Sequence, residues 1–206
     1  MIIKSKSIKS LKATERAIRY ILTGHTNQVD GFVLTQYIRG DRAYTKKLKE
    51  AEHQEQSSII TEHRIQNMMK HVSDNNEKRR IKRTTGNVSY HEIISFHKSD
   101  TQKLSQDVLL KVARKYIQQR SPNSLIVSTM HSDKEFRHIH FVISSVEFAT
   151  GKVIRKTHKE FKDIKLTMEQ WQNKELGLVH SKVNHSKKKP SRYLQKLSIK
   201  FNYEKE

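Results

Sequence analysis

Two strand patterns joined by a short polar loop constrain the fold of this chain more than any other feature. Residues 125–131 (LIVSTMH) and 138–148 (HIHFVISSVEF) are rich in the β-branched and aromatic residues that strands favour, and the loop between them, SDKEFR, is polar. If the two segments pair as an antiparallel hairpin, the end of the first strand lies beside the start of the second. The sequence therefore predicts a sheet that contains this hairpin.

Further strands and helices precede the hairpin. Residues 1–5 predict a short strand, and residues 88–97 alternate apolar and polar side chains with the period of a half-buried strand. Residues 11–23 and 105–120 carry apolar residues at helical spacing, which places Tyr116 in the core. The chain therefore combines several strands with amphipathic helices.

The segment after the hairpin contains a turn and one more predicted helix. Residues 149–152 (ATGK) have the composition of a turn. Thr167, followed three residues later by Gln170, has the spacing of a capping box. This spacing predicts a helix that begins at Thr167 and ends near Gly177.

Length and composition favour a single domain. A chain of 206 residues with 34% hydrophobic content is long enough to bury one core. Residues 41–83 are charge-rich and contain one helical stretch, 62–72, so we expect a helical or loop insertion whose position in the fold the sequence does not specify. Residues 181–206 form a basic C-terminal segment. We expect residues 1–206 to form one domain.

A strong excess of positive charge indicates a polyanionic partner. The chain has 41 Lys and Arg residues against 21 Asp and Glu residues, which gives a formal net charge of +20. An anionic membrane surface is the rival partner, but the single Trp171 does not lie in a basic amphipathic helix, so nucleic acid is favoured. Candidate DNA contacts lie in two basic runs and are Arg79, Arg80, Lys82, Arg83, Lys187, Lys188 and Lys189.

The absence of cysteine limits the metal chemistry that is open to the chain. No disulfide or thiolate site can form, so a bound metal must use His, Asp, Glu or water. The N-terminal residues MIIKSKSIKSLK lack the apolar core of a secretory signal, and no run approaches the roughly 18 apolar residues of a membrane span. We expect a soluble cytoplasmic protein without membrane insertion.

Three histidines and an aspartate lie around the hairpin loop. His138 and His140 project from one face of their strand, because alternate residues of a strand share a face. His131, at the end of the first strand, can supply a third nitrogen, and Asp133 can hold a histidine N–H. Three neutral nitrogens leave a divalent ion with open positions for water or phosphate. The alternative is a chance H-x-H pair, since the chain has twelve histidines.

The same residues resemble a motif of the relaxases, the mobilisation nucleases of conjugative and mobilisable plasmids, in the class with one catalytic tyrosine near the N-terminus. The motif is His-x-Asp-x4-His-x-His followed by apolar residues, and the segment from His131 through Asp133 and His138 to His140 matches it position by position. Three further segments follow the family's order: SIKSLKATERAIRYIL with its tyrosine, SYHEIISF, and VEFATGKVI. Ser144 departs from the pattern, since many relatives have Asn there.

The resemblance implies a fold, an activity and a set of partners. The implied fold is α+β, with a central, mostly antiparallel sheet flanked by helices, the HUH-endonuclease (relaxase) fold. The implied activity is site- and strand-specific nicking of DNA at a transfer origin through a 5′-phosphotyrosine, which initiates conjugative mobilisation. The implied cofactor is a divalent metal ion, Mg²⁺ or Mn²⁺. The implied partners are single-stranded origin DNA, accessory relaxosome proteins and a type IV secretion coupling protein in the bacterial cytoplasm.

The resemblance also assigns roles to individual residues. It implies that Tyr20 is the nucleophile and that Asp133 orients a histidine or helps to deprotonate the tyrosine. A Ser or Thr that holds DNA on the 3′ side of the cut corresponds to Thr84 or Thr85. The implied metal ligands are His131, His138 and His140.

Two other functions compete with this interpretation. Tyr193-Leu-Gln-Lys has the Tyr-x-x-Lys spacing of rolling-circle replication initiators, which place the tyrosine after the histidines. A non-enzymatic, basic nucleic-acid-binding module is the second alternative. From its own helix pattern, Tyr20 also fits a core or boundary position, so only its place in the family motif favours catalysis.

Overall fold

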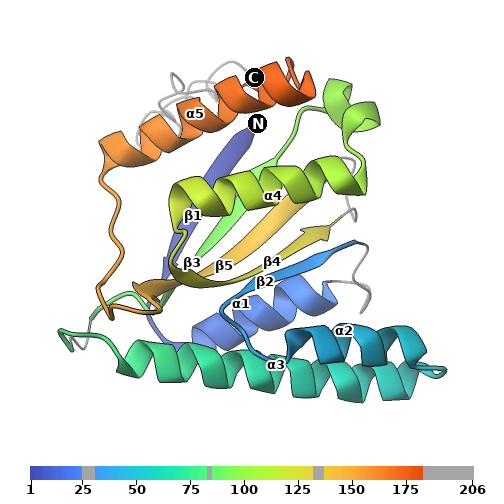
Figure 1. The fold of residues 1–206 in the computed structure, drawn as a ribbon, viewed down its shortest axis with the longest axis vertical. Helices are drawn as coiled ribbons and strands as arrows, with labels where there is room; N and C mark the ends of the chain where they lie inside the picture. Colours follow the sequence, from blue (N-terminus) through green and yellow to red (C-terminus); the bar gives the residue numbers. More distant parts are fainter. Residues whose placement is uncertain (25–30, 83–84, 132–136, 183–206) are drawn as a thin grey trace, which may run out of the picture.

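The computed structural model describes residues 1–24, 31–82, 85–131 and 137–182. A five-stranded sheet forms the centre of this part of the chain (Figure 1), in the order β1-β3-β5-β4-β2, and every neighbouring pair is antiparallel. The strands are β1 (Ile2–Ile8), β2 (Val33–Gln36), β3 (Ser89–Ser95), β4 (Ser124–His131) and β5 (His138–Glu147). The predicted α+β fold with an antiparallel sheet is confirmed.

The predicted hairpin lies at the centre of the sheet. β4 pairs with β5, and the register places His131 opposite His138. All of β4, and β5 up to Val146, is buried, as expected for strands that have a strand neighbour on each side and helices on both faces. The two strands that carry the histidines are therefore held by strand pairing on both edges and by packing on both faces.

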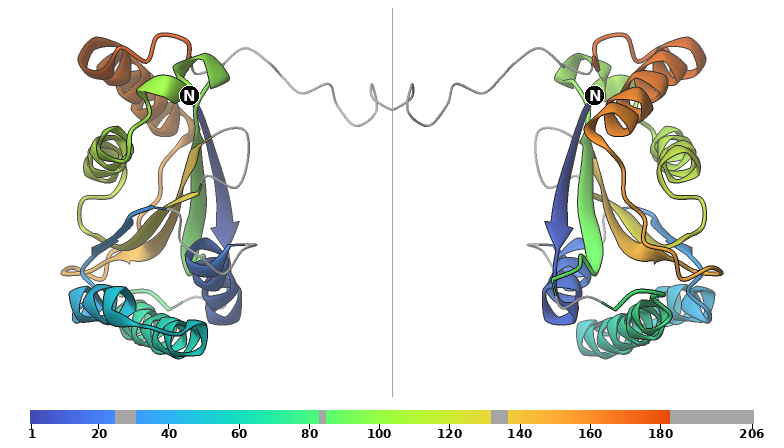
Figure 2. Two further views of the ribbon diagram at one scale, coloured as in Figure 1. Left: turned by 90° about the vertical axis from the view of Figure 1, so that its right-hand side faces the viewer. Right: turned by 90° about the vertical axis from the view of Figure 1, so that its left-hand side faces the viewer.

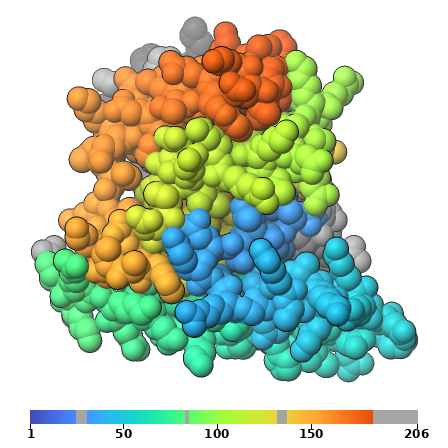
Figure 3. Space-filling view, in the orientation of Figure 1, coloured from blue at the N-terminus to red at the C-terminus, as the bar shows by residue number. Residues whose placement is uncertain are grey.

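Helices cover both faces of the sheet. The helices are α1 (Leu11–Thr23), α2 (Asp41–Glu50), α3 (Gln54–Glu77), the short 3₁₀ helix η1 (Lys98–Lys103), α4 (Gln106–Arg120) and α5 (His158–Leu176). Figure 2 shows α4 and α5 on one side of the sheet and α1 on the other. In the space-filling view, α5, α4 and β2 with α2 lie one below another and cover the central strands on that face (Figure 3).

Strand alternation divides the buried residues into two cores. Ile139 and Phe141 of β5 pack with Tyr116 of α4 on one face, while Val142 packs with Ile18 of α1 and with α3 on the other face. Tyr116 is fully buried, as the helix pattern predicts. His138 and His140 lie on the same face of β5 as Val142, which is the face that packs against α1.

The segment 41–82 consists largely of α2 and α3, and the predicted helical stretch 62–72 lies inside α3. A buried ion pair joins the two helices, with Arg64 Nε 2.7 Å from Asp41 Oδ1. Asn75 of α3 donates hydrogen bonds to Ser144 Oγ and to the Val146 carbonyl of β5, both at 2.9 Å. α3 is therefore fixed to the central strand, and Ser144 contributes a hydrogen-bond acceptor to this contact.

The start of α5 differs from the sequence-based expectation. The helix begins at His158, and Thr157, not Thr167, is its N-cap: the Thr157 side chain accepts from Glu160 N, and the Glu160 carboxylate accepts from Thr157 N. Thr167 lies inside the helix, because the earlier capping box lets Phe161 and Ile164 join the core. The predicted end is confirmed, since Gly177 has φ 63°.

Candidate functional site

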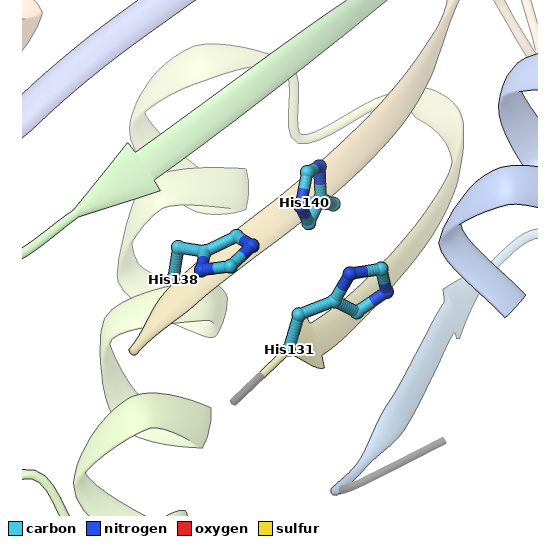
Figure 4. A group of neighbouring side chains, drawn as sticks. All are labelled: His131, His138 and His140. Atoms are coloured by element: carbon cyan, nitrogen blue, oxygen red, sulfur yellow. The ribbon is translucent and has the colours of Figure 1, made fainter. Parts of the chain in front are cut away.

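Three imidazoles converge at one end of the central hairpin. His131 ends β4, and His138 and His140 lie on β5 (Figure 4). One ring nitrogen from each histidine lies within 4.8 Å of the others, and all three side chains are buried. Their clustering follows from the register and from strand alternation, as predicted, because Ile139 points to the opposite face.

The histidine cluster fits a single divalent metal ion. Metal–nitrogen bonds of about 2.0–2.1 Å hold the ligand nitrogens of one ion roughly 3–4 Å apart. Small rotations of the three imidazoles would close the present spacing of up to 4.8 Å to that range. Three neutral nitrogen ligands also leave positions open for phosphate oxygen and water. His131, His138 and His140 can therefore form an open metal site.

The structure brings Tyr20 to this cluster across more than a hundred residues of sequence. Its ring centroid lies 5.5 Å from that of His140 and 5.8 Å from that of His131, both in edge-to-face geometry. Tyr20 belongs to the last turn of α1, where the Gly24 N–H donates to its carbonyl at 2.8 Å. The half-buried Tyr20 ring thus lies beside the candidate metal ligands.

The C-terminal end of α1 is tied to β4 through the Ile21 carbonyl. Thr129 Oγ1 donates to this oxygen at 2.8 Å, and His131 Nε2 lies 2.8 Å from it. Because a carbonyl oxygen only accepts, Nε2 of His131 carries the proton and Nδ1 keeps the lone pair that a metal ion needs. One contact therefore fixes both the His131 tautomer and the position of the helix turn that carries Tyr20.

His91 is a fourth imidazole in the cluster, and the sequence analysis did not assign it a role. Its Nε2 lies 3.0 Å from His140 Nδ1, and its ring centroid is 6.2 Å from that of Tyr20. Burial, and then the charge of Lys6, lower the pKa of His91, which favours a neutral ring. The signal was present in the sequence, because alternation in 88–97 places His91 on the polar face of its strand.

A cavity of about 590 Å³ opens beside the cluster. Tyr20, His138 and His140 line it on one side. Three basic side chains, Lys4, Lys98 and Lys182, also line it, and no acidic side chain does so among the described residues. The cavity can therefore bring an anionic ligand, such as a phosphodiester, to the histidines and the phenol.

The predicted DNA contacts in 78–85 lie away from this cavity. Arg79 is buried, and its guanidinium donates to the Asn87 carbonyl and to Ser145 Oγ, so the structure gives it an internal role. Arg80 donates to the Thr150 carbonyl at 2.8 Å, while Lys82 and Thr85 are exposed. The predictions that fall outside the described residues concern Arg83, Thr84, Asp133, Lys187, Lys188, Lys189 and Tyr193.

Comparison with known protein families shows which family the chain belongs to. The family described as relaxase, MobA/VirD2-like, nuclease domain, matches residues 37–177. The chain belongs to this relaxase family. The matched part of the relaxase contains His91 and all three candidate metal ligands, but it begins after Tyr20. The family therefore identifies the chain as a relaxase that nicks DNA for mobilisation.

Solved structures share the fold of this relaxase. The MobM relaxase domain (MOBV; Mob_Pre) bound to 26-nucleotide pMV158 oriT DNA is 18% identical, with a TM-score of 0.55 over 92% of this chain and 95% of that chain. A Mn-bound crystal structure of the same domain with 22-nucleotide oriT DNA, at pH 5.5, is 15% identical, with a TM-score of 0.58 over 96% and 100% of the two chains. A structure that describes the molecular basis of vancomycin resistance transfer in Staphylococcus aureus is 13% identical, with a TM-score of 0.53 over 90% and 97%.

Two other searches, one for curated relatives and one for membrane-spanning helices, found nothing. Curated protein sequences contain no match to the chain. Among the described residues, no helix combines the length and the apolar character needed to cross a membrane.

Proposed function

We propose that the relaxase cuts one DNA strand at a transfer origin by attack of the Tyr20 phenol oxygen on a phosphodiester, and that this nick initiates conjugative mobilisation. The observation that carries the proposal is the position of Tyr20, 5.5 Å from His140 and 5.8 Å from His131 between ring centroids. Tyr20 also lines the cavity that reaches the histidines. The proposed nucleophile and the proposed metal ligands therefore lie beside one opening that can admit a substrate.

The proposed step exchanges one phosphate ester for another. The phenol oxygen forms a bond to phosphorus, the bond from phosphorus to the 3′ oxygen breaks, and the proton lost by the phenol balances the proton that the 3′ hydroxyl gains. The product is a 5′-phosphotyrosine, so the same groups can rejoin the strand. Because a phenol has a pKa of about 10, it is a weak nucleophile at neutral pH and needs activation by its surroundings.

His131, His138 and His140 would hold a divalent metal ion next to the scissile phosphate. When bound, the ion supplies Lewis-acid stabilisation of the charge that develops on the phosphate oxygens. We favour Mn²⁺ over Mg²⁺, because Mg²⁺ prefers oxygen ligands and a solved structure of the same fold is Mn-bound. We propose that Asp133 orients one of the ligands or helps to deprotonate Tyr20.

The surroundings of the ligands support this assignment. The Ile21 carbonyl orients His131, and His91 can accept a hydrogen bond from Nδ1–H of His140, which leaves Nε2 of His140 for the metal. A histidine that merely added to a basic surface would not need such partners. The buried, hydrogen-bonded arrangement is typical of metal ligands, not of a non-enzymatic binding face.

The charge of the chain supports a DNA substrate. A net charge of +20 and the basic lining of the cavity would hold a single strand mainly through its phosphates, so binding should weaken steeply with salt. The MobM relaxase domain is bound to oriT DNA in the solved structures. We propose origin DNA as the substrate, and accessory relaxosome proteins and a type IV secretion coupling protein as partners in the bacterial cytoplasm.

A covalent-adduct assay tests the assignment of Tyr20. The full chain is incubated with Mn²⁺ and fluorescent single-stranded DNA from the transfer origin of its own element, and adducts are separated on a denaturing protein gel. We expect the wild-type chain and a matched control, Tyr44→Phe on α2, to form the adduct, and Tyr20→Phe to lose it.

Two other results would contradict the proposal. An adduct that survives in Tyr20→Phe but disappears in Tyr193→Phe supports the rolling-circle arrangement. Cleavage without any adduct supports a phosphodiesterase that uses water in place of tyrosine.

A further inference from the structure

A second, larger cavity of about 810 Å³ lies where β1 and β3 meet the start of α5. Figure 1 shows β1 and the orange connection from β5 to α5 on the same side of the molecule. Among the described residues, no acidic side chain lines this cavity. Its basic lining residues are Lys4, Arg79, Arg120, Arg155, Lys156 and Lys165.

Two of these cations are already neutralised or bound within the fold. Arg120 forms a buried ion pair with Glu92, with Nη2 3.0 Å from Oε1. Arg79 donates to Asn87 and Ser145. Both side chains form part of the cavity wall. Glu92 neutralises the charge of Arg120, whereas the partners of Arg79 are uncharged, so Arg79 keeps its positive charge.

The other four cations remain available to a ligand. Lys4 and Arg155 are exposed and make no ion pair with another described residue, and Lys156 lies 3.9 Å from Glu160, a distance at which solvent weakens the pair. Lys165 Nζ lies 4.6 Å from the centre of the Phe161 ring. Burial lowers the pKa of Lys165 against the opposing effect of Glu92. A polyanion would therefore meet several cations here, and among the described residues no acidic side chain lines the cavity itself.

The second cavity and the active-site cavity meet at the edge strand β1. Lys4 lines both cavities. Lys4 is paired with Ile93, and Ile93 is paired with His140, so Lys4 lies two strand spacings, about 10 Å, from the metal ligand. In the other direction, Arg79 and Gly86 line both the second cavity and a third one, whose charged residues also include Lys9, Lys82 and the acidic Glu77. A largely basic series of cavities therefore runs from the histidines around β1 to Arg79 and Lys82.

We propose that the second cavity docks the single-stranded DNA that continues from the nick site, with phosphates held by Lys4, Arg155 and Lys156. The strand turns around the edge of β1 from one face of the sheet to the other. This proposal rests on the proposed function, because it takes the scissile phosphate to lie at Tyr20 and the histidines. It adds a binding site that is separate from the cleavage chemistry.

The proposal is tested by comparing two lengths of DNA. One single-stranded oligonucleotide extends about two nucleotides from the nick site on each side, and the other extends roughly ten, a length typical of single-strand binding sites. The double variant Arg155→Ala/Lys156→Ala is compared with Lys47→Ala/Lys49→Ala, which removes the same charge from exposed positions on α2. Fluorescence anisotropy gives the dissociation constant over a range of salt concentrations.

We expect the cavity variant to bind the long oligonucleotide about tenfold more weakly than the wild type and to bind the short one equally well. Its salt dependence on the long strand should be shallower by about 1.4, which corresponds to two lost phosphate contacts. The α2 control should match the wild type on both oligonucleotides. Equal losses on both lengths, or no loss on either, would overturn the proposal.

Two additional measurements distinguish a failure of the cavity proposal from a failure of the Tyr20 assignment. The cavity variant should still form the covalent adduct with the short oligonucleotide, whereas a failure of the Tyr20 assignment would remove the expected adduct pattern without changing the length comparison. The second measurement repeats the titration with a long oligonucleotide whose flanking DNA is double-stranded. If the cavity variant loses affinity only for this probe, the assignment of a single strand to the cavity is wrong.

Discussion

His131 donates a hydrogen bond from Nε2 to the carbonyl of Ile21 at 2.8 Å, and so a candidate metal ligand holds the helix turn that carries the candidate nucleophile. The same oxygen accepts from Thr129 Oγ1 at 2.8 Å. The last carbonyls of a helix have no partner inside the helix. Here, strand β4 supplies the missing donors, and the position of Tyr20 therefore depends on side chains of β4.

Replacing Thr129 with Val should weaken the contact between α1 and β4 without replacing a candidate metal ligand. We expect the free energy of unfolding to fall by about 1 kcal/mol, because one buried hydrogen bond to Ile21 is lost while His131 keeps the other. Urea unfolding measures the change. Thr167→Val on the exposed side of α5 is the matched control and should alter stability by less than about 0.5 kcal/mol.

Replacing His91 should weaken metal binding more than it weakens folding. His91→Phe removes the acceptor that faces His140 Nδ1, so we expect Mn²⁺ affinity to fall by about 10- to 100-fold in calorimetric titrations. His91→Gln keeps an acceptor oxygen and should recover part of the affinity. The exposed His63→Gln on α3 serves as the control. Unchanged affinity in His91→Phe would show that His140 is oriented without His91.

The ion pair between α1 and α3 should make the free energy of unfolding decrease at low pH. Arg19 of α1 pairs with Glu62 of α3, and its hydrogen bonds hold the pKa of Glu62 at about 2. Because the folded pKa is below the unfolded one, this contribution is present above about pH 5 and is lost as the pH falls towards 2. The pair is partly exposed, so we expect only about 0.5–1 kcal/mol.

Glu62→Gln isolates that contribution. The difference in unfolding free energy between wild type and Glu62→Gln should be largest near pH 6 and should shrink by about pH 3, as measured by urea unfolding. A difference that stays constant over this range would show that the ion pair is not its origin.

Removing one partner of the buried ion pair between Glu92 of β3 and Arg120 of α4 should strongly lower the free energy of unfolding. Glu92 accepts from Arg120 and from the Tyr116 hydroxyl, at 3.0 Å and 2.6 Å. Glu92→Leu leaves the Arg120 charge buried without its partner, so we expect a loss of about 3–5 kcal/mol in thermal or urea unfolding. The double variant Glu92→Leu/Arg120→Met should be more stable than the single variant, because no buried charge is left. A double variant that is no better would contradict this explanation.

Local sequence patterns were sufficient for the hairpin and its histidines. The pairing of β4 with β5 needs only a short connection, and alternation then fixes that His138 and His140 share a face. The role of His91 required more, because His91 meets His140 only through the register between β3 and β5, which are far apart in sequence. Alternation indicates which face a residue occupies, but it does not indicate the neighbouring strand.

Competing local signals explain the other differences. Thr157 with Glu160 and Thr167 with Gln170 both have capping-box spacing, and the choice between them depends on whether Phe161 and Ile164 can join the core. Arg79 belongs to a basic run that composition associates with DNA, yet the fold uses its guanidinium to satisfy the Asn87 carbonyl. Neither outcome is encoded within the segment itself.

The basic edge strand has a consequence for self-association. β1 lies at one edge of the sheet, and such an edge presents unpaired backbone groups to which another copy of the chain could add a strand. Lys4 and Lys6 are exposed on β1, and two copies that approached edge to edge would bring these like charges together. The charges that attract DNA to β1 therefore also oppose aggregation through it, and the edge remains accessible for a nucleic-acid strand.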